Sequence, residues 1–179
     1  MKVLVCAASK HGATAQIGEA IADALNENGI HAALRAPQQI ADLQGYDALV
    51  LGSGVYMGRW LPDARRLVER ISGQLNGRPV WLFSSGPIGD PARQNSRPPV
   101  NASAIIAATA AREHRVFSGR MERAQLGIVH RAIMSAMHIA DGDDRDWAEI
   151  AAWGKQIAEQ LRSSSSTSTQ SESEPGGVR

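Results

Sequence analysis

Cysteine is almost absent from this sequence, which holds a single one, Cys6, among 179 residues. One cysteine excludes an internal disulfide and any metal site built from several thiolates. Cys6 lies in the middle of a short apolar run, where a thiol is normally buried and inert. We therefore expect neither a reactive thiol nor a metal site.

Long apolar runs and a bias of charge are also missing. No stretch approaches the roughly 18 to 20 apolar residues of a membrane-spanning helix, and the chain starts with a strand pattern rather than a signal-peptide pattern. We therefore expect a cytoplasmic protein. The formal net charge is +1 and the charges are spread along the chain, which argues against a nucleic-acid partner.

Short apolar runs of strand length alternate with helical patterns. Strands are expected at Lys2–Ala8, Ile30–Arg35, Asp47–Gly52, Arg78–Ser85 and His114–Phe117. Helices are expected from Thr14 to the Gly29 stop and from Pro62 to Leu75, then at Ala102–Ala111, Met121–Ala140 and Trp147–Leu161. This order predicts an α/β fold with a doubly wound, five-stranded parallel sheet, helices on both faces and an additional helix after the fifth strand.

The domain organisation follows from where the apolar periodicity stops. Residues 1–162 form one expected domain, long enough to bury a sizeable core. Residues 163–179 are rich in serine and lack an apolar period, so we expect a disordered tail there.

The loop after the first strand is small, polar and followed by a helix. It consists of Ser9, Lys10, His11, Gly12, Ala13 and Thr14. Backbone N–H groups, hydroxyl donors and the helix dipole would together favour an anion. Only one glycine is present and Lys10 precedes it, so the loop matches neither the dinucleotide nor the ATP-type pattern, and a monophosphate is favoured over a pyrophosphate. An ordinary Ser/Gly turn with a threonine cap is the alternative.

Two further loops follow the third and fourth strands. The second contains Ser53, Gly54, Val55, Tyr56, Met57 and Gly58, and the third begins with Ser85, Gly86 and Pro87. Glycines let the backbone approach a flat ring edge, and Tyr56 or Trp60 could cover a ring face. Trp60 could equally lie in the core beneath the next helix. In open α/β sheets the carboxyl ends of the strands meet at the ligand site, so the three loops are expected to converge.

The loops together resemble those of the flavodoxin-like superfamily. Its Thr/Ser-x-Thr-Gly-x-Thr loop is similar to residues 9–14, with His11 in place of a hydroxyl residue. ASKHGAT, GSGVYMGRW, WLFSSGP and Asp143–Ile150 resemble in particular the flavodoxin-domain group that includes the menaquinone-dependent protoporphyrinogen IX dehydrogenases. The resemblance implies FMN, with its phosphate at residues 9–14 and its isoalloxazine between residues 53–58 and 85–87. His11 would donate to the phosphate through its ring or only through its backbone N–H.

The same resemblance implies an FMN-dependent oxidoreductase with a tetrapyrrole or other small-molecule substrate and menaquinone as acceptor. Arg59, Arg93 and Arg97 belong to the loops around the expected flavin and could receive substrate carboxylates. We assign no catalytic side chain, because the flavin carries the chemistry in such proteins.

A flavodoxin-type electron carrier without its own substrate is the alternative. Carriers are usually acidic and cover the ring with two aromatics, whereas this chain is not acidic and its third loop holds no aromatic. A phosphate-binding module without flavin is a third hypothesis.

The helix expected at Met121–Ala140 has a broad apolar face with arginines nearby in sequence. In the resembled dehydrogenases an insertion after the fifth strand is associated with membrane or quinone access, which implies peripheral contact at the inner face of a membrane. Packing against its own domain or against the partner of a homodimer is the alternative.

Overall fold

The computed structural model of the protein describes residues 1–86, 102–121 and 142–170. Parallel strands form one sheet in the order β2-β1-β3-β5-β6. Their bounds are Lys2–Ala8 for β1, His31–Arg35 for β2, Ala48–Tyr56 for β3, Val80–Gly86 for β5 and Glu113–Ser118 for β6. The predicted α/β class and parallel sheet are thus confirmed.

Two short antiparallel ladders accompany the parallel sheet. Strand β4, Arg59–Trp60, folds back onto β3 and lengthens the sheet locally. Strands β7, Arg120–Met121, and β8, Gly142–Asp143, pair with each other and with no other strand that the structure describes. The sequence pattern predicted neither ladder, because two-residue strands leave no detectable periodicity.

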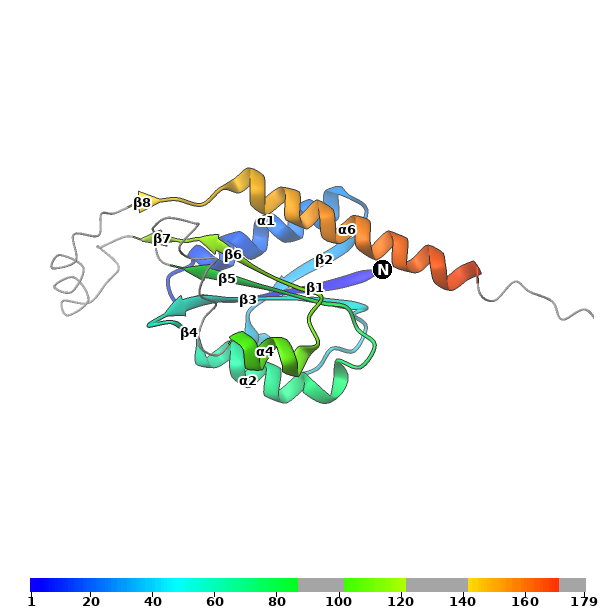
Figure 1. The fold of residues 1–179 in the computed structure, drawn as a ribbon, viewed down its shortest axis with the longest axis horizontal. Coiled ribbons are helices and arrows are strands. Elements are labelled where there is room, and N and C mark those ends of the chain that lie inside the picture. Colours follow the sequence, from blue (N-terminus) through cyan, green and yellow to red (C-terminus); the bar gives the residue numbers. More distant parts are fainter. Residues whose placement is uncertain (87–101, 122–141, 171–179) are drawn as a thin grey trace, which may run out of the picture.

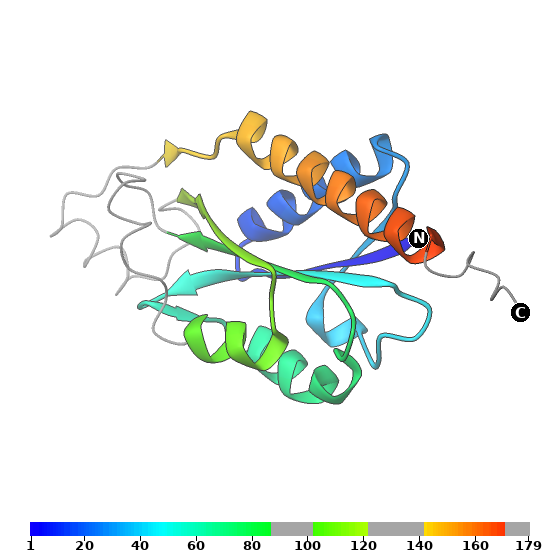
Figure 2. The same cartoon turned by 45° about the vertical axis from the view of Figure 1, so that its right-hand side comes forward.

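Helices cover both faces of the sheet, as Figure 1 shows. Helices α1, Ala13–Glu27, and α6, Trp147–Gln170, lie on one face. Helices α2, Pro62–Ile71, and α4, Ala102–Thr109, lie on the other. Short 3-10 turns occur at Pro37–Gln39 and Ser72–Gln74. The turned view in Figure 2 shows the same three layers, which are two layers of helices with the sheet between them.

Burial on both faces explains why the strands read as continuous apolar runs. Val3, Val5 and Ala7 of β1 pack into the core beneath α1 and α6. Leu4 and Cys6 of the same strand pack into the core beneath α2 and α4. Successive side chains of a strand point to opposite faces, so a strand covered on both sides requires apolar residues at every position.

Cys6 is fully buried in this arrangement. Burial raises the pKa of its thiol to about 12, with Arg70 opposing the shift weakly. The thiolate, which is the reactive form, is therefore negligible at neutral pH. The structure agrees with the expectation of an inert cysteine.

The ends of several helices differ from the sequence expectation. Helix α6 continues to Gln170 instead of stopping at Leu161, so it extends into the segment that was expected to be a disordered tail. The hydroxyls of Ser163 and Ser164 bond back to the carbonyls of Glu159 and Gln160, which satisfies polar groups along the helix extension. Helix α4 ends at Thr109, because Ala110 adopts a left-handed φ of 46°.

Some predictions lie outside the described residues. The expected helix at Met121–Ala140 falls there from residue 122 onward, and Met121 itself belongs to β7. The tail from residue 171 also lies outside. Among the helices that the structure describes, none is long and apolar enough to cross a membrane.

A close approach of α1 and α6 at Gly154 gives a test of the packing. A Cβ at Gly154 would lie 2.7 Å from Cβ of Ala24 and 3.2 Å from the carbonyl oxygen of Ile21. We expect Gly154→Val to lower the free energy of unfolding by about 1–3 kcal/mol, because both contacts are fixed to the α1 backbone. Ala152→Val on the exposed face of the same helix should cost about 0.6 kcal/mol or less. Urea denaturation of both variants measures the difference, and equal losses would contradict the packing argument.

Candidate functional site

The carboxyl ends of β1, β3 and β5 meet at one edge of the sheet. Ala8 pairs with Ser53, and Gly54 pairs with Ser85, so the residues that follow each strand begin side by side. The strand order reverses between β1 and β3, and the carboxyl ends of the strands beside such a switch point are the ligand-binding position of open α/β sheets. The predicted convergence of the first two segments and of Ser85 and Gly86 is found; Pro87 lies outside the described residues.

The connection from β1 to α1 forms the first wall of the site. Gly12 is the N-cap residue of α1 and has a left-handed φ of 85°, which an L side chain would adopt only with strain. No side chain caps the helix, so its first-turn N–H groups have no capping partner. These donors, together with the positive end of the helix dipole, form an anion-binding surface. The threonine cap that the alternative interpretation predicted is therefore absent, and Thr14 lies buried inside the helix.

His11 carries the most informative atom of this wall. Its Nε2 is buried, yet it has no hydrogen-bond partner, and the described residues show no other buried side-chain nitrogen or oxygen in this state. Leaving such a group unpaired costs about 1–3 kcal/mol. A ligand atom at this nitrogen would remove the cost.

The second segment is a β-hairpin rather than the loop expected from Ser53 to Gly58. Ser53–Tyr56 continue β3, and the chain reverses through Met57 and Gly58 with φ values of 50° and 72°. Two left-handed residues in succession suit the twist of a two-residue hairpin. The sequence concealed the hairpin because methionine is an unusual residue at a left-handed position.

Tyr56 brings the hairpin against the first wall. Its ring centroid lies 6.2 Å from that of His11, and the Lys10 Nζ lies 5.5 Å from the Tyr56 centroid. A Cβ on Gly54 would stand 3.1 Å from the Thr14 hydroxyl oxygen, so the two backbones are close there as well. Tyr56 keeps 36% of its surface exposed, and partial burial raises the pKa of its phenol. The segment thus offers an aromatic face next to the anion-binding loop.

The other predicted site residues that the structure describes lie on the hairpin and at the end of β5. The Ser53 hydroxyl is fully buried; it donates to the Gly54 carbonyl and accepts the backbone N–H of Leu61, which closes the hairpin. Met57 is 97% exposed and Arg59 is exposed on β4. Ser85 and Gly86 end β5 inside the sheet, next to Gly119 after β6. Arg93 and Arg97 lie outside the described residues.

Trp60 belongs to the core and not to the ligand surface. The Trp60 indole Nε1 donates to the hydroxyl of Ser84 at 2.8 Å, and the same hydroxyl lies 2.8 Å from Nε2 of His114. The indole can only donate, so the Ser84 oxygen accepts and its own hydrogen can go to a neutral His114. These two hydrogen bonds connect the hairpin to β5 and β6. Sequence reasoning assigned no role to Ser84, although it lies within WLFSSGP, or to His114, because their hydrogen-bond partners lie far away in the chain.

The chain matches the flavodoxin domain family over residues 4–147. It belongs to this family. No curated protein matches the chain.

Solved structures support the same fold for this flavodoxin domain. A flavodoxin from the domain Archaea superposes with a TM-score of 0.62 at 14% identity, covering 90% of this chain and 99% of that one. The Streptococcus pneumoniae TIGR4 flavodoxin gives 0.59 at 16% identity, covering 92% and 99%. Rubredoxin oxygen:oxidoreductase of Desulfovibrio gigas gives 0.61 at 12% identity, and there the match covers 90% of this chain but 36% of the larger one.

The buried network predicts a pH dependence of stability. Desolvation lowers the pKa of His114, so below about pH 6.5 the unfolded chain binds a proton that the folded chain resists. The free energy of unfolding should therefore fall as the pH decreases from about 6.5 to 5. His114→Gln should flatten this part of the curve, whereas the exposed His31→Gln on β2 should leave it unchanged. An unaltered slope in His114→Gln would refute the assignment.

Proposed function

We propose that this flavodoxin domain binds FMN and transfers electrons through it. The observation that best supports this proposal is the unpaired, buried Nε2 of His11 beside the uncapped start of α1. A phosphate monoester supplies the acceptor oxygens that His11 and the first-turn N–H groups lack. When bound, FMN supplies a ring system that takes up and releases one or two electrons.

Each wall of the site would have its own part in holding FMN. Residues 9–14 would bind the phosphate, with the Lys10 ammonium adding positive charge. Tyr56 would lie against the isoalloxazine, and the backbone of residues 53–58, 85 and 86 would approach the ring edge. The hydroxyls of Ser53 and Ser84 would stabilise these segments from inside the protein, because both already form hydrogen bonds there. The residues present therefore fit the cofactor.

We further propose that the protein is an oxidoreductase with its own substrate, of the protoporphyrinogen dehydrogenase type, with a quinone as acceptor. The resemblance of four sequence segments to that group and the lack of an acidic charge excess support this proposal. Arg59 is exposed and lies opposite Tyr56 on the hairpin. Its guanidinium would bind a carboxylate of an anionic tetrapyrrole.

An electron carrier is the second candidate. The archaeal and streptococcal flavodoxins match this chain over 99% of their own lengths, so the domain has the size of a free-standing flavodoxin. A carrier would need no substrate pocket, and Tyr56 would then mainly shield the flavin.

Titration with FMN tests the cofactor. We expect the fluorescence of free FMN to be quenched at one equivalent of protein. His11→Ala should raise the FMN dissociation constant about tenfold, since a hydrogen bond to a charged group is lost. His31→Ala, an exposed substitution on β2, should have no effect. A wild-type protein that leaves FMN fluorescence unchanged would refute FMN binding, and an unchanged affinity in His11→Ala would refute the role of its ring.

Anaerobic turnover separates the enzyme from the carrier. For the enzyme we expect FMN-dependent oxidation of protoporphyrinogen IX by a menaquinone analogue, and a single two-electron step in a redox titration. Arg59→Ala should raise KM several-fold with little change in kcat, because it removes binding and not chemistry, whereas the exposed Arg65→Ala on α2 should change neither. Two separated one-electron steps without turnover would establish the carrier instead.

A further inference from the structure

Arg145 is a buried charge outside the site described above. It lies between β8 and α6, and its side chain is only 2% exposed. A guanidinium is buried at this level only when its charge and its N–H donors find partners. Its partners therefore indicate what it does.

Asp143 supplies the countercharge. Nε of Arg145 donates to Oδ1 of Asp143 at 2.7 Å, and Nη2 donates to Oδ2 at 2.6 Å, which is a two-pronged pair. The hydrogen bond from Arg145 is the main cause that lowers the pKa of Asp143. Both side chains are thus charged, and their opposite charges cancel. Arg145 therefore adds little to the net electrostatic field around it.

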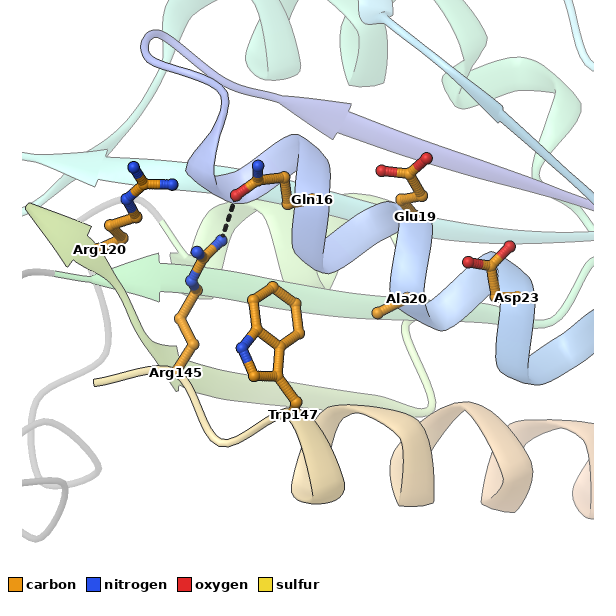
Figure 3. A pocket seen from close by; sticks show the side chains of 7 residues that line it. All are labelled: Gln16, Glu19, Ala20, Asp23, Arg120, Arg145 and Trp147. Atoms are coloured by element: carbon orange, nitrogen blue, oxygen red, sulfur yellow. Dashed lines mark hydrogen bonds between the residues drawn. The ribbon is translucent and has the colours of Figure 1, made fainter. Parts of the chain in front are cut away.

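The other side of the guanidinium reaches the first turn of α1. Nη1 of Arg145 donates to the Ala13 carbonyl at 3.2 Å and to Oε1 of Gln16 at 2.7 Å. Figure 3 shows the bond to Gln16 and the Trp147 ring beside it. The Arg145 Cζ lies 4.3 Å from the centroid of that ring, which holds the guanidinium from a further direction.

These contacts fix a helix start that its own residues leave without a cap. Ala13 directly follows Gly12, the left-handed residue of the anion-binding loop, and no side chain of the loop caps α1. Arg145 contacts this turn from its flank, on a carbonyl, and leaves the first-turn N–H groups free. A pocket of about 340 Å³ lies beside this contact, and Gln16, Arg145 and Trp147 are among the residues that line it.

We propose that Arg145 is a positioning residue for the phosphate end of the bound nucleotide. It holds the first turn of α1 so that the N–H groups of that turn stay aimed at the phosphate, and it does not touch the ligand. This inference rests on the FMN site proposed above. Among the residues that the structure describes, the hydrogen-bond partners of Arg145 lie on β8 and α1 and not on the hairpin or β5, so its effect is expected at the phosphate and not at the ring.

Comparing FMN with riboflavin, which lacks the phosphate, isolates that effect. We expect Arg145→Met to raise the FMN dissociation constant about tenfold and to change that of riboflavin less than about twofold. Arg145→Lys keeps the charge but cannot bond Asp143 and α1 together, so it should resemble Arg145→Met. Arg162→Met is the matched control, because Arg162 of α6 donates to the carbonyl of Asn28, the C-cap residue at the opposite end of α1. It should change neither constant.

Two further measurements test the proposal even when the Arg145→Met variant folds poorly. Gln16→Ala removes one partner from an exposed position, and it should weaken FMN about threefold without affecting riboflavin. In the protein without flavin, amide exchange at Gln16 and Ile17, measured by NMR, should be faster in Arg145→Lys than in the wild type.

Distinct results overturn the two proposals. Equal losses for both flavins would show that Arg145 only stabilises the fold, and full affinity in Arg145→Lys would show that charge alone suffices; either result refutes positioning. A wild-type protein that binds neither flavin refutes the FMN site itself. A wild-type protein that binds both, with unchanged FMN affinity in Arg145→Met and Gln16→Ala, refutes only the role of Arg145.

Discussion

The short connection between β1 and α1 is the constraint on which the rest of the structure depends. The chain leaves a fully buried strand and enters a helix within four residues, and Gly12 makes the turn by adopting a left-handed φ. This turn leaves the start of α1 without a side-chain cap. Free backbone donors, an unpaired His11 nitrogen and the aromatic ring of Tyr56 therefore meet at one point. The chain stabilises this polar arrangement by surrounding it with a rigid frame.

Two buried polar groups make that frame rigid. On the hairpin side, Ser84 connects Trp60 to His114, so the Met57–Gly58 turn is anchored to the strands next to it. On the helix side, Arg145 connects α1 to the chain that leads into α6. In each case a side chain from a remote part of the sequence restrains the backbone of a site segment. Rigidity at the site thus comes from outside the loops that would touch a ligand.

The sequence was sufficient for the sheet, and for which segments meet at its edge. Strands such as Lys2–Ala8 are buried on both faces, and this leaves a continuous apolar signature that is easy to read. The hairpin was not predictable, because Met57 occupies a left-handed position that normally carries asparagine or glycine. Nor were the roles of Arg145 and His114, since their partners lie far away in the chain and no periodicity encodes a long-range hydrogen bond. Arg145 lay within Asp143–Ile150, a segment singled out only for its resemblance.

The β7–β8 ladder has a consequence for how this fold can vary. Met121 and Gly142 are opposite one another in register, so the two ends of the segment 122–141 are held side by side. A longer segment between two ends held in this way would cost little additional free energy to close, because loop-closure entropy grows only slowly with length. The ladder is therefore a position at which evolution or engineering can change the length of the chain between Met121 and Gly142 at little entropic cost.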